Sequence, residues 1–241
     1  MIKIKNVSKY FGAKAALKNI NIEIGTGETL AIIGGSGSGK STLLRLMIGL
    51  IKPSEGEIWI GDDEISKMTE EKITKIRLKM GMVFQYSALF DSMTVGDNVA
   101  FGLVEHTNFS ADKIQNIVRE KLKQVGLEGV ENLMPNELSG GMKKRVSLAR
   151  AIAFEPEIIF YDEPSSGLDP IMTNKIDELI IETQRALKVI SVVVTHDMVS
   201  ACKIADRIAM IYNGELIAVD NVENFKKIDD PRVKEFFRHI D

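Results

Sequence analysis

The chain has 241 residues, of which 44% are hydrophobic, and its 31 basic and 34 acidic side chains leave a net charge of −3. This length allows one large domain or two small ones, with enough apolar side chains for a substantial core. The near balance of charge does not favour nucleic acid or an anionic membrane surface as a partner. Composition therefore indicates a globular protein and excludes a strongly basic or acidic interaction module.

Compartment is indicated by three features of the sequence. Cys202 is the only cysteine, which excludes an internal disulfide and fits a reducing compartment; we interpret it as a packed side chain. Residues 1–5 alternate apolar and charged side chains as a strand does, without the apolar core of a secretory signal. The sequence has no apolar run of the roughly 20 residues that a membrane span needs. We therefore expect a cytoplasmic protein whose membrane role, if any, depends on a partner.

The order of the predicted elements is typical of an α/β protein. Period-two patterns predict strands at 2–7, 20–24 and 58–60, which we assign to an N-terminal antiparallel β subdomain. Buried strands and intervening helices are predicted in alternation, with strands at 29–33, 81–84, 158–161, 192–194 and 208–211 and helices at 43–48, 69–79, 172–187 and 198–205. Strands that alternate with helices predict a mainly parallel sheet.

A block of helical pattern from about 94 to 152 interrupts this alternation. Apolar residues recur at three and four positions over 110–126, and a further helix should begin after Ser139 and run to 152. We interpret the block as a helical subdomain of about residues 86–155, inserted into a single domain of residues 1–241. Near the other end, residues 230–238 predict a short amphipathic helix, packed within the chain or docked on a second copy.

The most informative stretch is residues 34–42, Gly-Gly-Ser-Gly-Ser-Gly-Lys-Ser-Thr. It lies between a predicted buried strand and a predicted helix, which is the context of a phosphate-binding loop. Glycines let consecutive backbone N–H groups turn toward an anion, and the helix N-terminus adds partial positive charge. Lys40 would reach the β- and γ-phosphates, and Ser41 would ligate Mg²⁺. The stretch predicts that the chain binds a nucleoside triphosphate.

Two acids come directly after the predicted strand 158–161. Ligands of open α/β sheets bind outside the carboxyl ends of the strands, so Asp162 and Glu163 should face the phosphates. Asp162 is suited to hold Mg²⁺, and Glu163 is suited to polarise the water that attacks the γ-phosphate. The alternative is a pair of acids that cap a helix, which the preceding strand and Pro164 disfavour.

Four further features are ambiguous when each is taken alone. Residues 139–141, Ser-Gly-Gly, begin a predicted helix and offer a second anion-binding end, which could close over a nucleotide on another copy. His196 follows the strand 192–194 and could donate to the γ-phosphate, although a lone histidine is usually structural. Gln85 could ligate Mg²⁺ or orient water. Phe11 could stack on a base, although core packing is the default for it.

Together and in this order, the motifs closely resemble those of the nucleotide-binding subunits of ATP-binding-cassette (ABC) transporters. In that resemblance Gly34–Thr42 is the Walker A loop, Gln85 the Q-loop, Leu138–Met142 the signature, Ile158–Asp162 Walker B, Ser166–Asp169 the D-loop and His196 the switch histidine. The family implies a P-loop NTPase (RecA-like) core and a head-to-tail homodimer that sandwiches two ATP molecules.

The family also implies a set of site residues. Its positions assign ATP binding to Phe11 (rather than Tyr10), Gly34, Gly35, Ser36, Gly37, Ser38, Gly39, Lys40, Ser41, Thr42, Ser139, Gly140 and Gly141. Catalysis is assigned to Glu163, His196, Lys40 and Gln85, and Mg²⁺ binding to Ser41, Gln85 and Asp162.

One departure from the family pattern narrows the resemblance. Met142 stands where most cassettes have glutamine. This signature is similar to that of the ATPase subunits of Mla/Mce-type phospholipid transporters, and the same similarity extends over residues 84–95, 98–101 and 162–170. That subgroup implies an MlaE-like permease, an MCE-domain lipid-binding protein and, in some systems, a STAS-domain protein as partners. It places the chain on the cytoplasmic face of the inner membrane. The surface after Gln85, including Ser87, Leu89 and Phe90, would contact the permease, or these residues could belong to the core.

The resulting hypothesis is an ATPase that energises phospholipid transport by ATP-driven closing and opening of the dimer. Alternatives are a cassette ATPase for another cargo such as amino acids, and a soluble cassette protein that acts on nucleic acid or ribosomes. The balanced charge argues against a nucleic-acid partner. A P-loop kinase is disfavoured by the Ser-Gly-Gly motif at 139–141.

Overall fold

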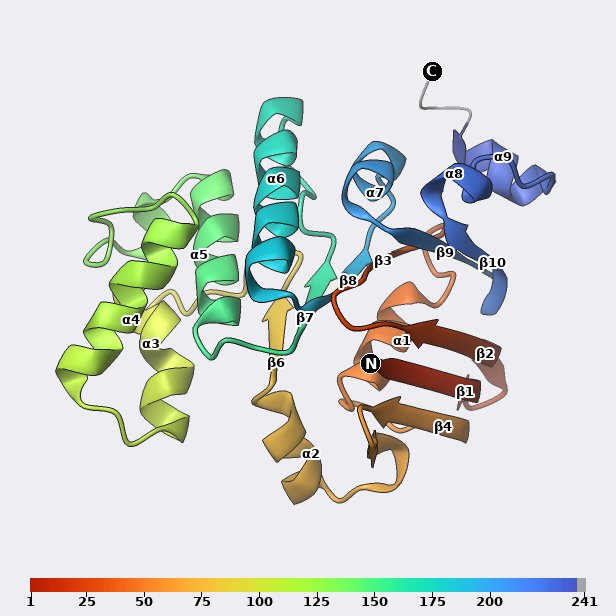
Figure 1. The fold of residues 1–241 in the computed structure, drawn as a ribbon, viewed down its shortest axis with the longest axis horizontal. Helices are drawn as coiled ribbons and strands as arrows, with labels where there is room; N and C mark the ends of the chain where they lie inside the picture. Colours follow the sequence, from red (N-terminus) through yellow and green to blue (C-terminus); the bar gives the residue numbers. More distant parts are fainter. Residues whose placement is uncertain (238–241) are drawn as a thin grey trace.

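The computed structural model describes residues 1–237, which form two β-sheets and the helices packed around them (Figure 1). The larger sheet has six strands in the order β10-β9-β3-β8-β7-β6. These are β3 (Thr29–Ile33), β6 (Met80–Val83), β7 (Ile158–Asp162), β8 (Ile190–Val194), β9 (Arg207–Tyr212) and β10 (Glu215–Asn221). All neighbouring strands are parallel except β9 and β10, which confirms the mainly parallel sheet.

The smaller sheet is antiparallel and has four strands in the order β2-β1-β4-β5. Its strands are β1 (Ile2–Phe11), β2 (Lys14–Ile24), β4 (Glu55–Ile60) and β5 (Asp63–Glu64), which confirms the N-terminal antiparallel subdomain. β1 and β2 extend beyond the predicted ranges. The reason is that their register shifts between Ile4 and Tyr10, so the two-residue alternation that marks a strand is lost there.

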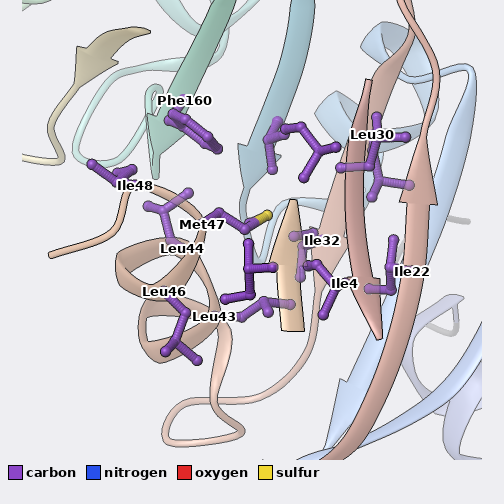
Figure 2. Packing of buried hydrophobic residues seen from close by; sticks show 14 of the residues in the cluster. Ile4, Ile22, Leu30, Ile32, Leu43, Leu44, Leu46, Met47, Ile48 and Phe160 are labelled. Atoms are coloured by element: carbon purple, nitrogen blue, oxygen red, sulfur yellow. The ribbon is translucent and has the colours of Figure 1, made fainter. Parts of the chain in front are cut away.

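The helices of the core are α1 (Lys40–Met47), α2 (Glu70–Arg77), α6 (Pro170–Leu187), α7 (Met198–Ile204), α8 (Val222–Phe225) and α9 (Pro231–Phe237). Figure 2 shows how α1 is held: Leu43 and Leu44 pack with Ile4 and Ile22 of the small sheet and with Leu30, Ile32 and Phe160 of the large one. Every residue of β3 and of β8 is buried, as expected for strands covered on both faces. The helix that follows the glycine loop is therefore fixed between the two sheets.

Three helices form a separate group beside β6 and β7, at the left of Figure 1: α3 (Val95–His106), α4 (Ala111–Gln124) and α5 (Gly140–Ile152). They share an apolar cluster that includes Leu103, Leu122 and Val146. Their starts are marked by side-chain caps at Thr94, Ser110 and Ser139. This group is the inserted helical subdomain. Two 3₁₀ turns, Ile65–Lys67 and Pro135–Glu137, lie outside the α-helices.

The C-terminal part contains elements that the sequence analysis did not predict. The strand β10 was missed because it is an edge strand whose five inner residues are all half-buried, so no alternation is visible. α9 matches the predicted amphipathic helix up to Phe237, and residue 238 lies outside the described residues. Phe236 and Phe237 pack against a cluster with Met198 and Phe225, as the intramolecular interpretation requires. Within residues 1–237, no helix is both long and apolar enough to cross a membrane.

Candidate functional site

The glycine loop joins β3 to α1, and two of its glycines are required by close approach. A Cβ atom at Gly34 would lie 2.2 Å from the carbonyl oxygen of Ile211. At Gly39, which caps α1 with φ 116°, a Cβ atom would lie 2.7 Å from the side chain of Leu17. The sequence therefore folds here into a tight turn that brings backbone N–H groups and the start of α1 to one point.

Lys40, the first residue of α1, is almost completely buried at 9% exposure. Its Nζ donates to the carbonyl oxygens of Gly34, at 2.7 Å, and of Gly35, at 3.1 Å. Burial lowers the pKa of the Lys40 ammonium, while the carboxylates of Glu163 and Asp162 act to raise it. The ammonium is thus held inside the loop, close to both acids that the sequence singled out.

A cavity of about 540 Å³ opens on the glycine loop. Its lining residues are Phe11, Lys14, Ala15, Ala16, Gly37, Ser38, Gly39, Lys40, Ser41, Thr42, Asn213 and Gly214. The predicted Gly34, Gly35 and Ser36 belong to the loop but do not line this cavity. Phe11 is 53% exposed at its edge, where a base could stack on the ring. The cavity combines an exposed aromatic ring with a phosphate-binding loop.

Sequence reasoning missed the lining residues 14–16 and 213–214. The turn between β9 and β10 contacts the glycine loop directly, because the Gly214 N–H donates to the Ser38 carbonyl at 2.9 Å. The same turn is joined to β2, because the Lys18 N–H donates to the Gly214 carbonyl at 2.8 Å. Asn213-Gly214 is a strong signal for a hairpin turn and could have located it in the sequence. Its contact with the glycine loop is a tertiary feature.

Asp162 and Glu163 lie at the carboxyl end of β7, beside the end of β8. Asp162 is the last residue of β7, and burial, followed by the neighbouring Glu163 carboxylate, raises the pKa of its carboxyl. Glu163 has φ 47°, and its N–H donates to the Val194 carbonyl at 2.8 Å. Its Oε2 lies 2.8 Å from Nδ1 of His196. The structure therefore brings together the acids and the histidine, as predicted from the order of strands.

Gln85 follows β6 and connects to another predicted motif. Its Nε2 donates to Oγ of Ser166 at 3.4 Å, and its backbone carbonyl accepts a hydrogen bond from Lys144. The amide oxygen of Gln85, the hydroxyl of Ser41 and the carboxylate of Asp162 are each hard oxygen donors of the kind that Mg²⁺ prefers. No group of three or more His, Cys, Asp or Glu side chains that could hold a metal occurs among residues 1–237. A single carboxylate with neutral oxygens fits Mg²⁺, which keeps waters and binds largely through substrate phosphates.

The Ser139-Gly140-Gly141 motif does not line the cavity beside the glycine loop. It begins α5 in the helical subdomain, where Ser139 Oγ accepts from the Met142 N–H at 3.3 Å. Gly141 packs so closely on α6 that a Cβ atom would lie 2.3 Å from Cε of Met172. The side chain of Met142 packs against the apolar cluster of the subdomain. One copy of the chain thus holds the two predicted anion-binding ends apart.

Comparison with known proteins identifies the family. The sequence profile described as ABC transporter matches residues 17–166. The chain belongs to the ABC transporter family. The intermembrane phospholipid transport ATP-binding protein MlaF of Escherichia coli K12 is 42% identical over 100% of this chain and 89% of its own length. The methionine import ATP-binding protein MetN of Clostridioides difficile is 42% identical over 92% of this chain and 69% of its own length.

A solved structure gives the same result for the fold. A dimeric ATP-binding cassette in a post-hydrolysis state, bound to ADP and Pi, has a TM-score of 0.85 and 37% identity to this chain. The match covers 92% of this chain and 99% of that cassette. The chain is therefore an ABC-type ATPase that binds ATP, with the P-loop α/β architecture predicted from its sequence.

The surface after the Q-loop differs in part from its prediction. Ser87 is only 4% exposed and the half-buried Leu89 packs against the helical cluster, so for these two residues the alternative that they belong to the core holds. Phe90 is 42% exposed, as predicted. It lies 4.7 Å from Phe101 between ring centroids, beside a hollow of about 320 Å³. The local pattern could not separate these residues, because Ser87 and Ala88 adopt left-handed backbone conformations that redirect their neighbours.

Proposed function

We propose that this chain is the ATPase subunit of a phospholipid transporter of the Mla type and that it works as a homodimer. The observation that carries the homodimer is the separation of the two anion-binding ends in one copy. Ser139, Gly140 and Gly141 lie at the start of α5 in the helical subdomain and are absent from the lining of the cavity that Lys40 faces, so a second copy would bring the signature onto a bound γ-phosphate. The dimeric cassette with ADP and Pi supports this arrangement.

In each site, ATP would lie along the glycine loop with its base against Phe11 and its phosphates on the N–H groups of residues 37–42. Lys40 and the partner's signature would bind the γ-phosphate, and His196 would orient it. Glu163 would hold the attacking water. Ser41, Gln85 and Asp162 would hold Mg²⁺, which neutralises charge on the phosphoryl group when it is bound. Loss of the γ-phosphate removes the contacts between the two copies, and the dimer opens.

The membrane partner would dock on the aromatic surface of Phe84, Tyr86, Phe90 and Phe101, which are 40%, 86%, 42% and 37% exposed. Exposed aromatic side chains around a hollow are typical of protein interfaces. This surface continues from the Q-loop, so a docked permease would respond to the nucleotide state. We infer that the chain works on the cytoplasmic face of the inner membrane, with an MlaE-like permease, an MCE-domain protein and, in some systems, a STAS-domain protein.

The similarity to MetN keeps one alternative open, an ATPase with another cargo such as an amino acid. Phospholipid is favoured because the similarity to MlaF extends over the whole chain and 89% of that protein, against 69% of MetN. Met142 and the segment after Gln85 also matched the phospholipid subgroup in the sequence.

The test is co-purification of the tagged, full-length chain from membranes in mild detergent, with identification of the bound proteins and lipids. We expect an MlaE-like permease, an MCE-domain protein and phospholipid. Phe101→Asp should lose the permease, whereas Phe109→Asp, at a similarly exposed aromatic (40%) that does not line the hollow beside Phe90, should retain it. An unrelated permease would overturn the phospholipid assignment and leave the ATPase mechanism. A soluble chain without any membrane partner would overturn both the cargo and the transporter role.

A further inference from the structure

Lys144 is a buried lysine that the site described above does not use. It lies on α5, only five residues after Ser139, and is 5% exposed. Within residues 1–237, no carboxylate lies within ion-pair distance of its Nζ. Lys121, the other buried lysine of the helical subdomain (2% exposed), pairs with Glu120 and Glu155 at 3.2 Å each. A buried ammonium without a carboxylate partner is costly, so its hydrogen bonds need an explanation.

The Lys144 ammonium donates to two backbone carbonyls, and each belongs to a different part of the ATPase site. One is the carbonyl of Gln85, at the start of the Q-loop. The other is the carbonyl of Glu163, at 3.4 Å. The same Glu163 has a left-handed backbone, with φ 47°, and directs its carboxylate to His196. One ammonium therefore joins α5, the Q-loop and the turn that carries the proposed water-orienting acid.

A second cation of α5 strengthens the connection to the Q-loop. Arg150 donates from Nη1 to the Ala88 carbonyl at 2.7 Å and from Nη2 to the Ser87 carbonyl at 2.9 Å. Ser87 and Ala88 have φ values of 62° and 46°, which non-glycine residues adopt only when their surroundings hold them. The backbone of residues 85–88 is thus fixed to α5 at both ends, so a displacement of α5 moves this segment as well.

From this geometry we propose that Lys144 is a positioning residue, which links closure of the signature helix on the partner's nucleotide to the placement of Glu163 in its own chain. The proposal rests on the homodimer argued above. α5 begins with the signature, so nucleotide on the partner copy pulls on its N-terminal turn. Lys144, just over one turn further along, transmits that displacement to the carbonyls of Gln85 and Glu163. Each site then becomes fully competent only when the opposite site is closed.

Removal of the ammonium should affect the chemical step more than nucleotide binding. Lys144 donates no hydrogen bond to the glycine loop and does not line the cavity there, so Lys144→Met should keep its ATP affinity within about twofold. The turn at Glu163 loses a donor, and kcat should fall by about tenfold or more because the acid must be accurately placed. Lys144→Arg keeps the cation and its donors and should recover most of kcat.

The experiment uses the full-length chain and measures three quantities for each variant. Affinity comes from titration with a fluorescent ATP analogue, kcat and KM come from phosphate release, and folding comes from the melting temperature. Lys121→Met is the matched control, because it removes a buried ammonium from the same subdomain without contacting the Q-loop or Glu163. It should leave kcat and KM close to those of the wild type. Lys144→Leu, which also removes the ammonium and its donors, provides a second variant in case Lys144→Met does not fold.

The outcomes separate this inference from the proposed function. Wild-type kcat in a folded Lys144→Met, or in a folded Lys144→Leu, would overturn the positioning role alone. The same would follow if Lys144→Arg were as slow as Lys144→Met, or if Lys144→Met lost affinity rather than kcat. A wild-type chain that binds ATP but never dimerises with it would instead refute the homodimer. A loss of kcat in Lys121→Met equal to that in Lys144→Met would show a general effect of buried charge, and would also overturn the inference.

Discussion

Oε2 of Glu163 lies 2.8 Å from Nδ1 of His196 and 3.4 Å from the backbone N–H of the same residue. An ionised carboxylate can only accept hydrogen bonds, so the imidazole donates from Nδ1 and leaves Nε2 directed elsewhere. The side chain of Glu163 is 13% exposed, whereas that of His196 is 68% exposed. The acid is therefore fixed by the end of β8, while the ring that holds it remains accessible from outside.

We expect Glu163→Gln to bind ATP as the wild type does and to hydrolyse it at least about a hundredfold more slowly, the range that an acid or base contributes. The amide keeps the size of the side chain but cannot polarise water. The closed dimer should therefore accumulate with ATP, which size-exclusion chromatography and phosphate release would show. Hydrolysis close to the wild-type rate would contradict the role of Glu163.

Removal of the ring in His196→Ala should lower kcat by about tenfold or more with little change in ATP affinity. Without the ring, the Glu163 carboxylate is no longer held in place, and it loses part of its contribution to the hydrolysis rate. The ring holds Glu163 and does not line the cavity at the glycine loop. Steady-state kinetics together with ATP titration would test this. The double variant His196→Ala/Glu163→Gln is the control, and it should be little slower than Glu163→Gln alone because both residues act as one unit. Independent, multiplicative losses would show that the two residues act separately.

Lys40→Met should weaken ATP binding by about tenfold to a hundredfold, the effect of losing one or two charge-assisted hydrogen bonds to phosphate. In the structure the ammonium is held by the carbonyls of Gly34 and Gly35 beside the cavity. Lys67→Met, at an exposed lysine that pairs with Glu64 and does not line the cavity, is the control and should bind normally. Unchanged affinity in Lys40→Met would mean that the lysine serves only the loop itself.

Asp177 gives the chain a predictable dependence of stability on pH. It is 2% exposed on α6 and accepts a hydrogen bond from Ser200 Oγ at 3.0 Å. Burial raises the pKa of its carboxyl to about 6, opposed by the Ser200 hydrogen bond and by Lys203, while Asp197 and Glu178 add to the shift. The folded state therefore holds this proton more tightly than the unfolded chain does. As the pH rises through the raised pKa, the folded state loses the associated stability.

Asp177→Asn removes this titration and keeps the volume of the side chain. Between about pH 5 and about pH 7.5, the free energy of unfolding of the wild type should fall by about 1 kcal/mol relative to the Asn variant. Denaturant unfolding at both pH values would measure it. Asp220→Asn, at a partly exposed acid of β10, should show no such difference, and parallel curves for wild type and Asp177→Asn would refute the shift.

Several motifs could be predicted from the sequence because their determinants are local. The apolar run 29–33, the glycines of residues 34–39 and the helix that starts at Lys40 are contiguous, and propensity and burial act on them in the same direction. Asp162, Glu163 and His196 could be placed together because parallel strands end at one edge of the sheet. Local sequence is thus enough to predict the α/β core and to locate the glycine loop as a phosphate site.

Other features depend on contacts between residues far apart in the chain, and no local sequence pattern contains such contacts. The Gly214–Ser38 contact, the half-buried β10 and the burial of Ser87 all follow from how separate elements pack. The same holds for Lys144, which the sequence shows only as one lysine in a basic helix. Packing places its ammonium between the carbonyls of Gln85 and Glu163, residues 59 and 19 positions away along the chain. Local sequence is enough to predict which groups should bind phosphate. Which distant segments are joined to one another depends on the tertiary structure, because burial and hydrogen bonding between them fix those relations.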